Sequence, residues 1–225
     1  MANANTATYS GRSIIWRMVK GAGTEPKNIG WGDSTVTGSA NPNVNLFKPQ
    51  TETRVAGTST MTTTSFLGDT YQVVGTLTCL VGAKTITEAG LFDTTTLSPT
   101  TTVAASMTAG QTTVSLGSAS GIATSSYYRQ IENETVLVTA GSNSTTETIT
   151  RGALGSTSAV HSSGVATTVG GDGGASAGGA TSGQGGTSAA STAALGGSIF
   201  AHADFAGIGL SVSDSINFTF LDVLT

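Results

Sequence analysis

Apolar and polar residues alternate along the C-terminal part of the chain, and this period-two pattern constrains the fold more than any other feature. The even-numbered positions from Ile208 to Phe220 carry apolar side chains, interrupted only by Asp214, and most odd positions between them are Ser, Asn or Thr. In an extended strand, alternate side chains point to opposite faces, so one face is apolar and the other polar. Tyr71–Val81 has a similar pattern, with apolar residues or glycine at its odd positions.

Further segments favour strands over helices. No window has the apolar stripe at i, i+3, i+4 and i+7 that is typical of an amphipathic helix, so we expect little helix. Arg54–Phe66 is rich in Thr, whose β-branched side chain suits a pleated surface, and Gly68-Asp69 predicts a turn after it. Three short strands are predicted further along, at Tyr127–Ile131, Thr135–Thr139 and Glu147–Arg151. A turn at Gly141–Asn143 connects the last two.

Two shifts in composition divide the chain. Residues 94–102 form a Thr/Ser/Pro stretch, and residues 170–196 are rich in Gly, Ser and Ala and read as a linker. Residues 103–169, which lie between them, carry their own strand signals. We therefore predict an all-β fold: a β-sandwich (jelly-roll-like) host domain of residues 1–95 plus 197–225, with a small β-domain of residues 103–169 inserted into one of its loops.

The charge content excludes several classes of function. Only 10% of the 225 residues are charged and the net charge is −4, with no basic stripe that would bind nucleic acid. Such a surface repels copies of itself weakly, which suits a protein that packs against others. The first ten residues lack the apolar run of a secretory signal, and no stretch approaches 18 apolar residues. We expect synthesis in the cytoplasm and no contact with a membrane.

No motif for catalysis, cofactor binding or metal binding emerges, so we expect no enzyme, no cofactor and no metal site. The single cysteine, Cys79, excludes a disulfide framework and a Cys-based zinc site. His161 and His202 lie in different predicted domains without a partner at ligand spacing. Glu132 and Glu134 share one face of an extended segment, but the aromatic residues of a sugar-binding cleft are missing, so a solvated strand face is the favoured interpretation.

A structural role is expected for the remaining polar residues of the predicted small domain. Arg151 carries a planar guanidinium that can donate two parallel hydrogen bonds. We expect it to bind backbone carbonyls or Glu134, and we expect His161 to brace the loop that begins at Arg151-Gly152.

Two segments resemble known virus proteins. The first pairs KTITEAGLFD at Lys84–Asp93 with the C-terminal stretch Gly197–Phe220, which contains SIFAHADF and VSDSINFTF. Together they resemble a β-sandwich module of tailed-bacteriophage virion proteins, although a long insertion separates the two halves here. The second, Ile131–Gly164, is similar to a small β-module of phage structural proteins; Val136 replaces the methionine usual in that module.

The resemblance implies a structural protein of the virion. The expected function is that of a capsid decoration (cement) protein, which bridges and stabilises subunits of the major capsid protein on the capsid surface. Many copies on a symmetric lattice would act together, and a homotrimer is the expected form. The alternative is a tail-fibre or baseplate adhesin that binds a host surface glycan through the inserted domain, which an exposed aromatic patch of Tyr127 and Tyr128 would favour.

The segment Ser13, Ile14, Ile15 and Trp16 is the most apolar piece near the N-terminus. One interpretation makes it the first strand of the sandwich. The other makes it an interface anchor, with residues 1–10 crossing onto a neighbouring subunit and pairing with its sheet edge. Deleting residues 1–10 should then weaken attachment to the particle without unfolding the protein, and unchanged binding would contradict the anchor.

Overall fold

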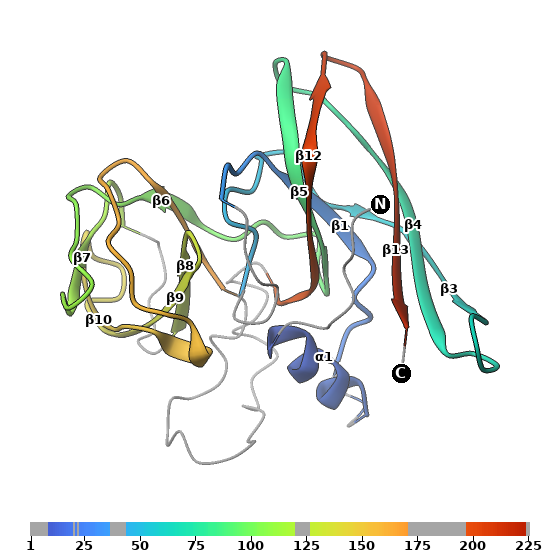
Figure 1. The fold of residues 1–225 in the computed structure, drawn as a ribbon, viewed down its shortest axis with the longest axis horizontal. Helices are drawn as coiled ribbons and strands as arrows, with labels where there is room; N and C mark the ends of the chain where they lie inside the picture. Colours follow the sequence, from blue (N-terminus) through green and yellow to red (C-terminus); the bar gives the residue numbers. More distant parts are fainter. Residues whose placement is uncertain are drawn as a thin grey trace.

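The structure, a computed structural model, describes residues 9–19, 21, 23–36, 44–119, 127–170 and 197–223. Its strands form three antiparallel sheets (Figure 1), which confirms the predicted all-β, sandwich-like fold. The Gly/Ser/Ala-rich stretch predicted as a linker lies, apart from Gly170, outside the described residues. Among the described residues, no helix combines the length and the apolar character needed to cross a membrane.

The strands are named here in their spatial order within each sheet. Sheet A consists of β12 (Ile199–Leu210), β5 (Lys84–Phe92), β1 (Asn28–Gly32) and β2 (Val55–Ala56). Sheet B consists of β13 (Ser215–Val223), β4 (Thr70–Thr78) and β3 (Thr58–Thr62). Sheet C consists of β6 (Thr100–Thr102), β11 (Ala166–Val169), β8 (Tyr127–Ile131), β9 (Glu134–Ala140), β10 (Thr146–Thr150) and β7 (Thr113–Ser115). The helical elements are α1 (Tyr9–Val19) and the 3-10 turn η1 (Ala153–Gly155).

Sheets A and B pack face to face around one apolar core. Trp31 of β1, Leu77 of β4 and Leu91 of β5 are buried in it, and Phe220 of β13 closes it from the other sheet. Trp31 and the half-buried Phe218 meet edge to face, with ring centroids 6.4 Å apart, a favoured aromatic geometry. The apolar face that the alternation in Tyr71–Val81 predicts is thus the inner face of β4.

The C-terminal alternation spans two strands instead of one. A turn at residues 211–214 joins β12 of sheet A to β13 of sheet B, and Asp214 stabilises the turn by accepting a hydrogen bond from the Ser211 N–H at 2.7 Å. Leu210 and Phe220 are buried, whereas Ile208 and Val212 are exposed near the turn. The prediction of a single apolar face is therefore wrong around the turn.

The interpretation of Ser13–Trp16 as a strand is also wrong, because these residues lie in α1. Gly11 and Ile14 are buried one helical turn apart, and α1 lies against β12 (Figure 1). A Cβ atom at Gly11 would come within 2.4 Å of the Phe200 carbonyl oxygen, so glycine permits the close approach of helix and strand. Packing against β12 thus stabilises a helix where the local apolar run suggests a strand.

Sheet C curls around a second core, and all of its strands come from residues 100–169. The strands predicted at Tyr127, Thr135 and Glu147 are confirmed as β8, β9 and β10, and the predicted turn begins at Gly141, with φ of +76°. Sheets A and B take their strands from either side of this segment. This arrangement is the one that the predicted insertion requires, and the exact domain boundaries stay a prediction.

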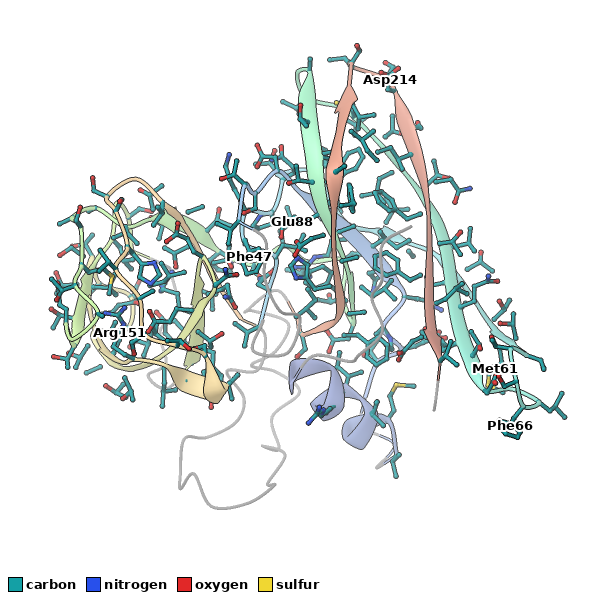
Figure 2. The ribbon with its side chains drawn as sticks, in the orientation of Figure 1. Phe47, Met61, Phe66, Glu88, Arg151 and Asp214 are labelled. Atoms are coloured by element: carbon teal, nitrogen blue, oxygen red, sulfur yellow. The ribbon has the colours of Figure 1, made fainter. Side chains whose placement is uncertain are left out.

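Residues 44–48 form hydrogen bonds both with the sandwich and with sheet C (Phe47 and Glu88 are labelled in Figure 2). On the side of sheet C, Asn45 Nδ2 donates to the Val169 carbonyl at 2.9 Å, and Thr168 Oγ1 donates to the Leu46 carbonyl at 3.2 Å. On the side of sheet A, the Glu88 carboxylate accepts the N–H groups of Phe47 and Lys48 at 3.0 and 2.8 Å. We call residues 44–48 the junction segment, because it is hydrogen-bonded to both units.

Candidate functional site

The predicted interface residues are split between core and surface. Within α1, the Ile14 side chain is fully buried, whereas Ile15 is 41% exposed. The side chains of Ser13 and Trp16 lie outside the described part of the chain. Ile14 therefore contributes to the fold, and a role of this segment as an interface anchor stays a prediction.

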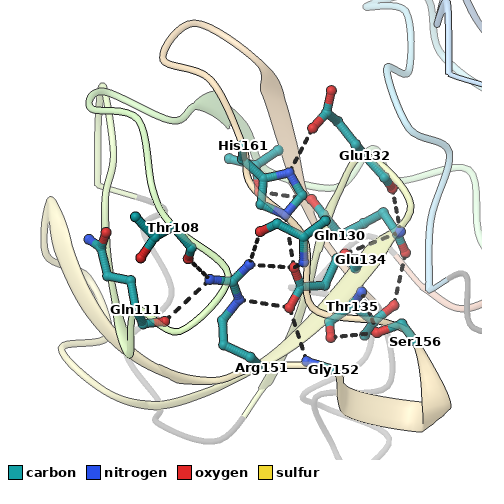
Figure 3. Close-up of polar contacts among 12 residues, drawn as sticks. Thr108, Gln111, Gln130, Glu132, Glu134, Thr135, Arg151, Gly152, Ser156 and His161 are labelled. Carbon is teal, nitrogen blue, oxygen red and sulfur yellow. Dashed lines mark hydrogen bonds and ion pairs between the residues drawn. The ribbon is translucent and has the colours of Figure 1, made fainter.

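Glu134 is buried at the centre of a polar cluster in sheet C (Figure 3), so the prediction that it shares a solvated strand face with Glu132 is wrong. Its buried carboxylate accepts two hydrogen bonds from Arg151, at 2.7 and 2.6 Å, and one each from the N–H groups of Gly152 and Ala159 at 3.0 Å. Arg151 also donates to the carbonyls of Thr108, Gln111 and Ala159. The prediction that Arg151 binds Glu134 or carbonyls is confirmed, since it binds both.

His161 completes this cluster. Its Nε2 lies 2.9 Å from Glu134 and its Nδ1 lies 2.6 Å from Glu132. Burial alone would lower the pKa of His161, but hydrogen bonds and charge from the two carboxylates raise it above its ordinary value. Burial would likewise raise the pKa of Glu134, whereas hydrogen bonds from Arg151, His161, Ala159 and Gly152 lower it to about 2. An ionised carboxylate saturated with donors holds loops together and is a poor proton acceptor.

A second buried cluster joins β8 to β10. The guanidinium of Arg129 binds the Glu147 carboxylate through two hydrogen bonds, at 2.9 and 2.8 Å, and the Tyr127 hydroxyl donates to the same carboxylate. Tyr127 is only 1% exposed. It therefore cannot form an exposed aromatic patch with Tyr128, so the feature that would favour glycan binding is missing here.

A third cluster consists of Glu88, His202 and Asp204 on neighbouring strands of sheet A. Among the described residues, these form the one group of three metal-ligating side chains whose ligand atoms lie within 4.8 Å of one another. His202 Nε2 lies 2.9 Å from Glu88 and 3.3 Å from Asp204. Since Glu88 also holds the junction segment, and the Phe47 ring packs edge-on against His202 at 4.9 Å, the cluster fixes this segment on sheet A.

Exposed apolar side chains gather at one end of the sandwich, in β3 and in the loop that joins it to β4 (Figure 2). Leu67 is 96% exposed, Phe66 77% and Met61 76%. We call these three residues the apolar tip. Isolated exposed apolar residues are common, but a cluster of large ones typically marks a contact site. Their exposure is absent from the sequence-based predictions, because an apolar run next to a strand usually indicates core.

Apolar side chains are also exposed at the opposite end of the sandwich, next to the exposed Asp214. There the β4–β5 and β12–β13 connections expose Leu80, Val81 and Val212. Beside them lies a shallow, open depression, which we call the end hollow. It is lined by Ala83, Lys84, Thr85, Gly209, Leu210 and Ser211. The described geometry thus places candidate contact surfaces at both ends of the sandwich.

Comparison with known proteins found no family model, no curated protein and no solved structure that matches the chain.

Proposed function

We propose that this chain is a non-enzymatic structural protein of a tailed-bacteriophage particle, acting as a decoration protein that bridges neighbouring capsid subunits. The observation that supports a structural role most is the pair of exposed apolar surfaces at the two ends of a rigid sandwich. A protein whose large apolar side chains face solvent when it is alone gains free energy by covering them, at about 25 cal/mol per Å² of apolar surface.

The buried polar groups also favour a structural role. The carboxylates of Glu134 and Glu147 are each saturated by an arginine and further donors, and Glu88 holds two backbone N–H groups and a histidine. Catalytic acids and bases need an oxygen or nitrogen free to reach a substrate. These groups instead hold loops and the junction segment in place.

The phage setting of the proposal comes from the resemblance of Lys84–Asp93 and Gly197–Phe220 to virion modules. In the fold these two segments supply β5 and β12, which pair with each other at one edge of sheet A although an insertion of about 100 residues separates them. Such a pairing agrees with one module interrupted by another. The adhesin alternative lacks a comparable support, because Tyr127 is buried.

The experiment is a heat-stability test on particles that lack the protein. Decorated and undecorated particles are heated, and release of the packaged genome is followed with a dye that fluoresces on DNA. We expect undecorated particles to release DNA at a lower temperature, and we expect purified protein to restore the original temperature after it is added back. Equal release temperatures, or failure of the added protein to bind, would contradict a decorating role.

A further inference from the structure

We propose that Glu88, His202 and Asp204 bind a divalent transition-metal ion of the Zn²⁺ class, which clamps the junction segment onto sheet A. His202 and Asp204 lie two positions apart on β12, so their side chains leave the same face of the strand. Asp204 is paired directly with Glu88 of β5, which brings a second carboxylate to this face. The inference concerns a ligand site, and it does not depend on whether the chain decorates a particle.

The three ligand atoms converge on one point. His202 Nε2 lies 2.9 Å from a Glu88 oxygen and 3.3 Å from an Asp204 oxygen. Zn²⁺ holds nitrogen and carboxylate oxygen ligands at about 2.0–2.2 Å in a tetrahedron, which places neighbouring ligand atoms about 3.3–3.6 Å apart. Small movements of the carboxylates therefore admit the ion. The Asp204 side chain is 21% exposed, so an ion can enter from its side of the cluster.

The charges of the cluster also favour a divalent cation. Two carboxylates directly opposite each other on one face of a sheet repel, and Glu88 is fully buried, where solvent screens the repulsion least. A divalent ion between the two balances both negative charges while His202 stays neutral, which is the form of imidazole that binds metals. A proton on His202 balances only one of them.

The other histidine of the chain contacts two carboxylates in a geometry that does not fit an ion. Glu134 lies at His161 Nε2 and Glu132 at His161 Nδ1, so the two carboxylates approach different nitrogens of the ring. Glu134 is also saturated by Arg151. At His202, one and the same nitrogen faces both carboxylates. A nitrogen with a single hydrogen cannot donate a full hydrogen bond to each, whereas an ion contacts all three ligand atoms at once.

Contacts outside the cluster hold the Glu88 carboxylate in place. It accepts the N–H groups of Phe47 at 3.0 Å and Lys48 at 2.8 Å, and a Cβ atom at position 32 would collide with it, so Gly32 leaves the space that it occupies. The buried Phe47 ring packs edge-on against His202, with ring centroids 4.9 Å apart (Phe47 and Glu88 are labelled in Figure 2). Such outer contacts orient metal ligands in proteins. A bound ion thus ties β5, β12 and the junction segment together.

The ligand set favours Zn²⁺ and related ions over Mg²⁺ and Ca²⁺. Mg²⁺ and Ca²⁺ prefer six or more oxygen ligands, many of them from water or carbonyl groups, whereas an imidazole nitrogen beside two carboxylates suits transition-metal ions. The expectation of no metal site comes from spacing along the sequence. That spacing cannot reveal this cluster, because Glu88 and His202 lie 114 positions apart.

Calorimetric titration of protein stripped of metals by a chelator tests the site. We expect wild type to bind one Zn²⁺ per chain and to show no binding of Mg²⁺ at the same concentration. Asp204→Asn should weaken Zn²⁺ binding by at least about tenfold. The matched control is Glu132→Gln, which also removes a partly exposed carboxylate beside a histidine and should leave the affinity unchanged. Absence of Zn²⁺ binding, equal binding of Mg²⁺, or equal losses in the two variants would overturn the proposal.

Nitrogen NMR of the two imidazole rings identifies the ligand without any substitution, and it decides the matter if Asp204→Asn does not fold. The chain has only two histidines, so their ring signals are readily told apart. Addition of Zn²⁺ should shift the Nε2 signal of His202 and leave the signals of His161 in place. A shift at His161 alone, or at neither ring, would show that the ion does not bind at this cluster.

Discussion

The substitution Glu134→Gln tests whether the polar cluster of sheet C stabilises the fold. The carboxylate accepts five hydrogen bonds at 2.6–3.0 Å, from Arg151, Gly152, Ala159 and His161. A glutamine has nearly the same shape, but one end of its amide is a donor and would face other donors. It also leaves the guanidinium of Arg151 without its buried counter-charge.

Breaking a buried pair of this kind costs about 3–5 kcal/mol. This is a large share of the roughly 5–15 kcal/mol that stabilises a typical domain. The matched control is Glu132→Gln: the Glu132 side chain is 33% exposed and contacts the same histidine, so its loss should cost about 0–1 kcal/mol.

Hydrogen exchange of amides in residues 127–170 measures the effect where it arises. Tryptophan fluorescence reports on the rest of the chain, because residues 127–170 contain no tryptophan. We expect Glu134→Gln to accelerate exchange throughout sheet C far more than Glu132→Gln does. If the two variants exchange at similar rates, the assignment of Glu134 as the stabilising centre is wrong.

Three further perturbations follow from the same contacts. Because the pKa of His161 is raised, its contribution to stability is complete below the ordinary histidine pKa of about 6.5 and is lost as the pH rises through the pKa in the folded protein. The difference in melting temperature between wild type and His161→Gln should therefore shrink at alkaline pH. A constant difference would contradict this. Glu134, with a pKa lowered to about 2, stabilises the fold above the ordinary pKa of 4.5 and loses this effect as the pH falls toward 2. The acid unfolding of sheet C should therefore occur between these pH values and should shift in Glu134→Gln. An unchanged acid transition would argue against this. Glu147→Gln should lower the free energy of unfolding, measured in urea, by about 3–5 kcal/mol, and the double variant Arg129→Met/Glu147→Met should lower it less. A larger loss in the double variant would show that the ion pair itself is strongly stabilising.

Sequence patterns predict the parts of the fold that are local. Alternation identifies β4, and short β-branched runs bounded by turn residues identify β8, β9 and β10. The link from Arg151 to Glu134 is also foreseeable, because a guanidinium and a carboxylate on neighbouring predicted strands of a charge-poor chain have few other partners.

Features that depend on tertiary contacts could not be predicted from the sequence. The helix α1 exists because Gly11 and Ile14 pack against β12, a contact that no local pattern encodes. The cluster of Glu88 and His202 joins residues 114 positions apart. The exposure of Phe66 and Leu67 depends on where the β3–β4 hairpin ends relative to the core, which the sequence pattern does not show.

The number of copies of the chain on each purified particle tests the proposed structural role most directly. Quantitative mass spectrometry against the major capsid protein gives this ratio without assuming a mechanism. A decoration protein that covers the capsid predicts hundreds of copies in a fixed ratio to the capsid subunits. A few copies to some tens per particle would place the chain in the tail, and its absence from particles would contradict a virion role altogether.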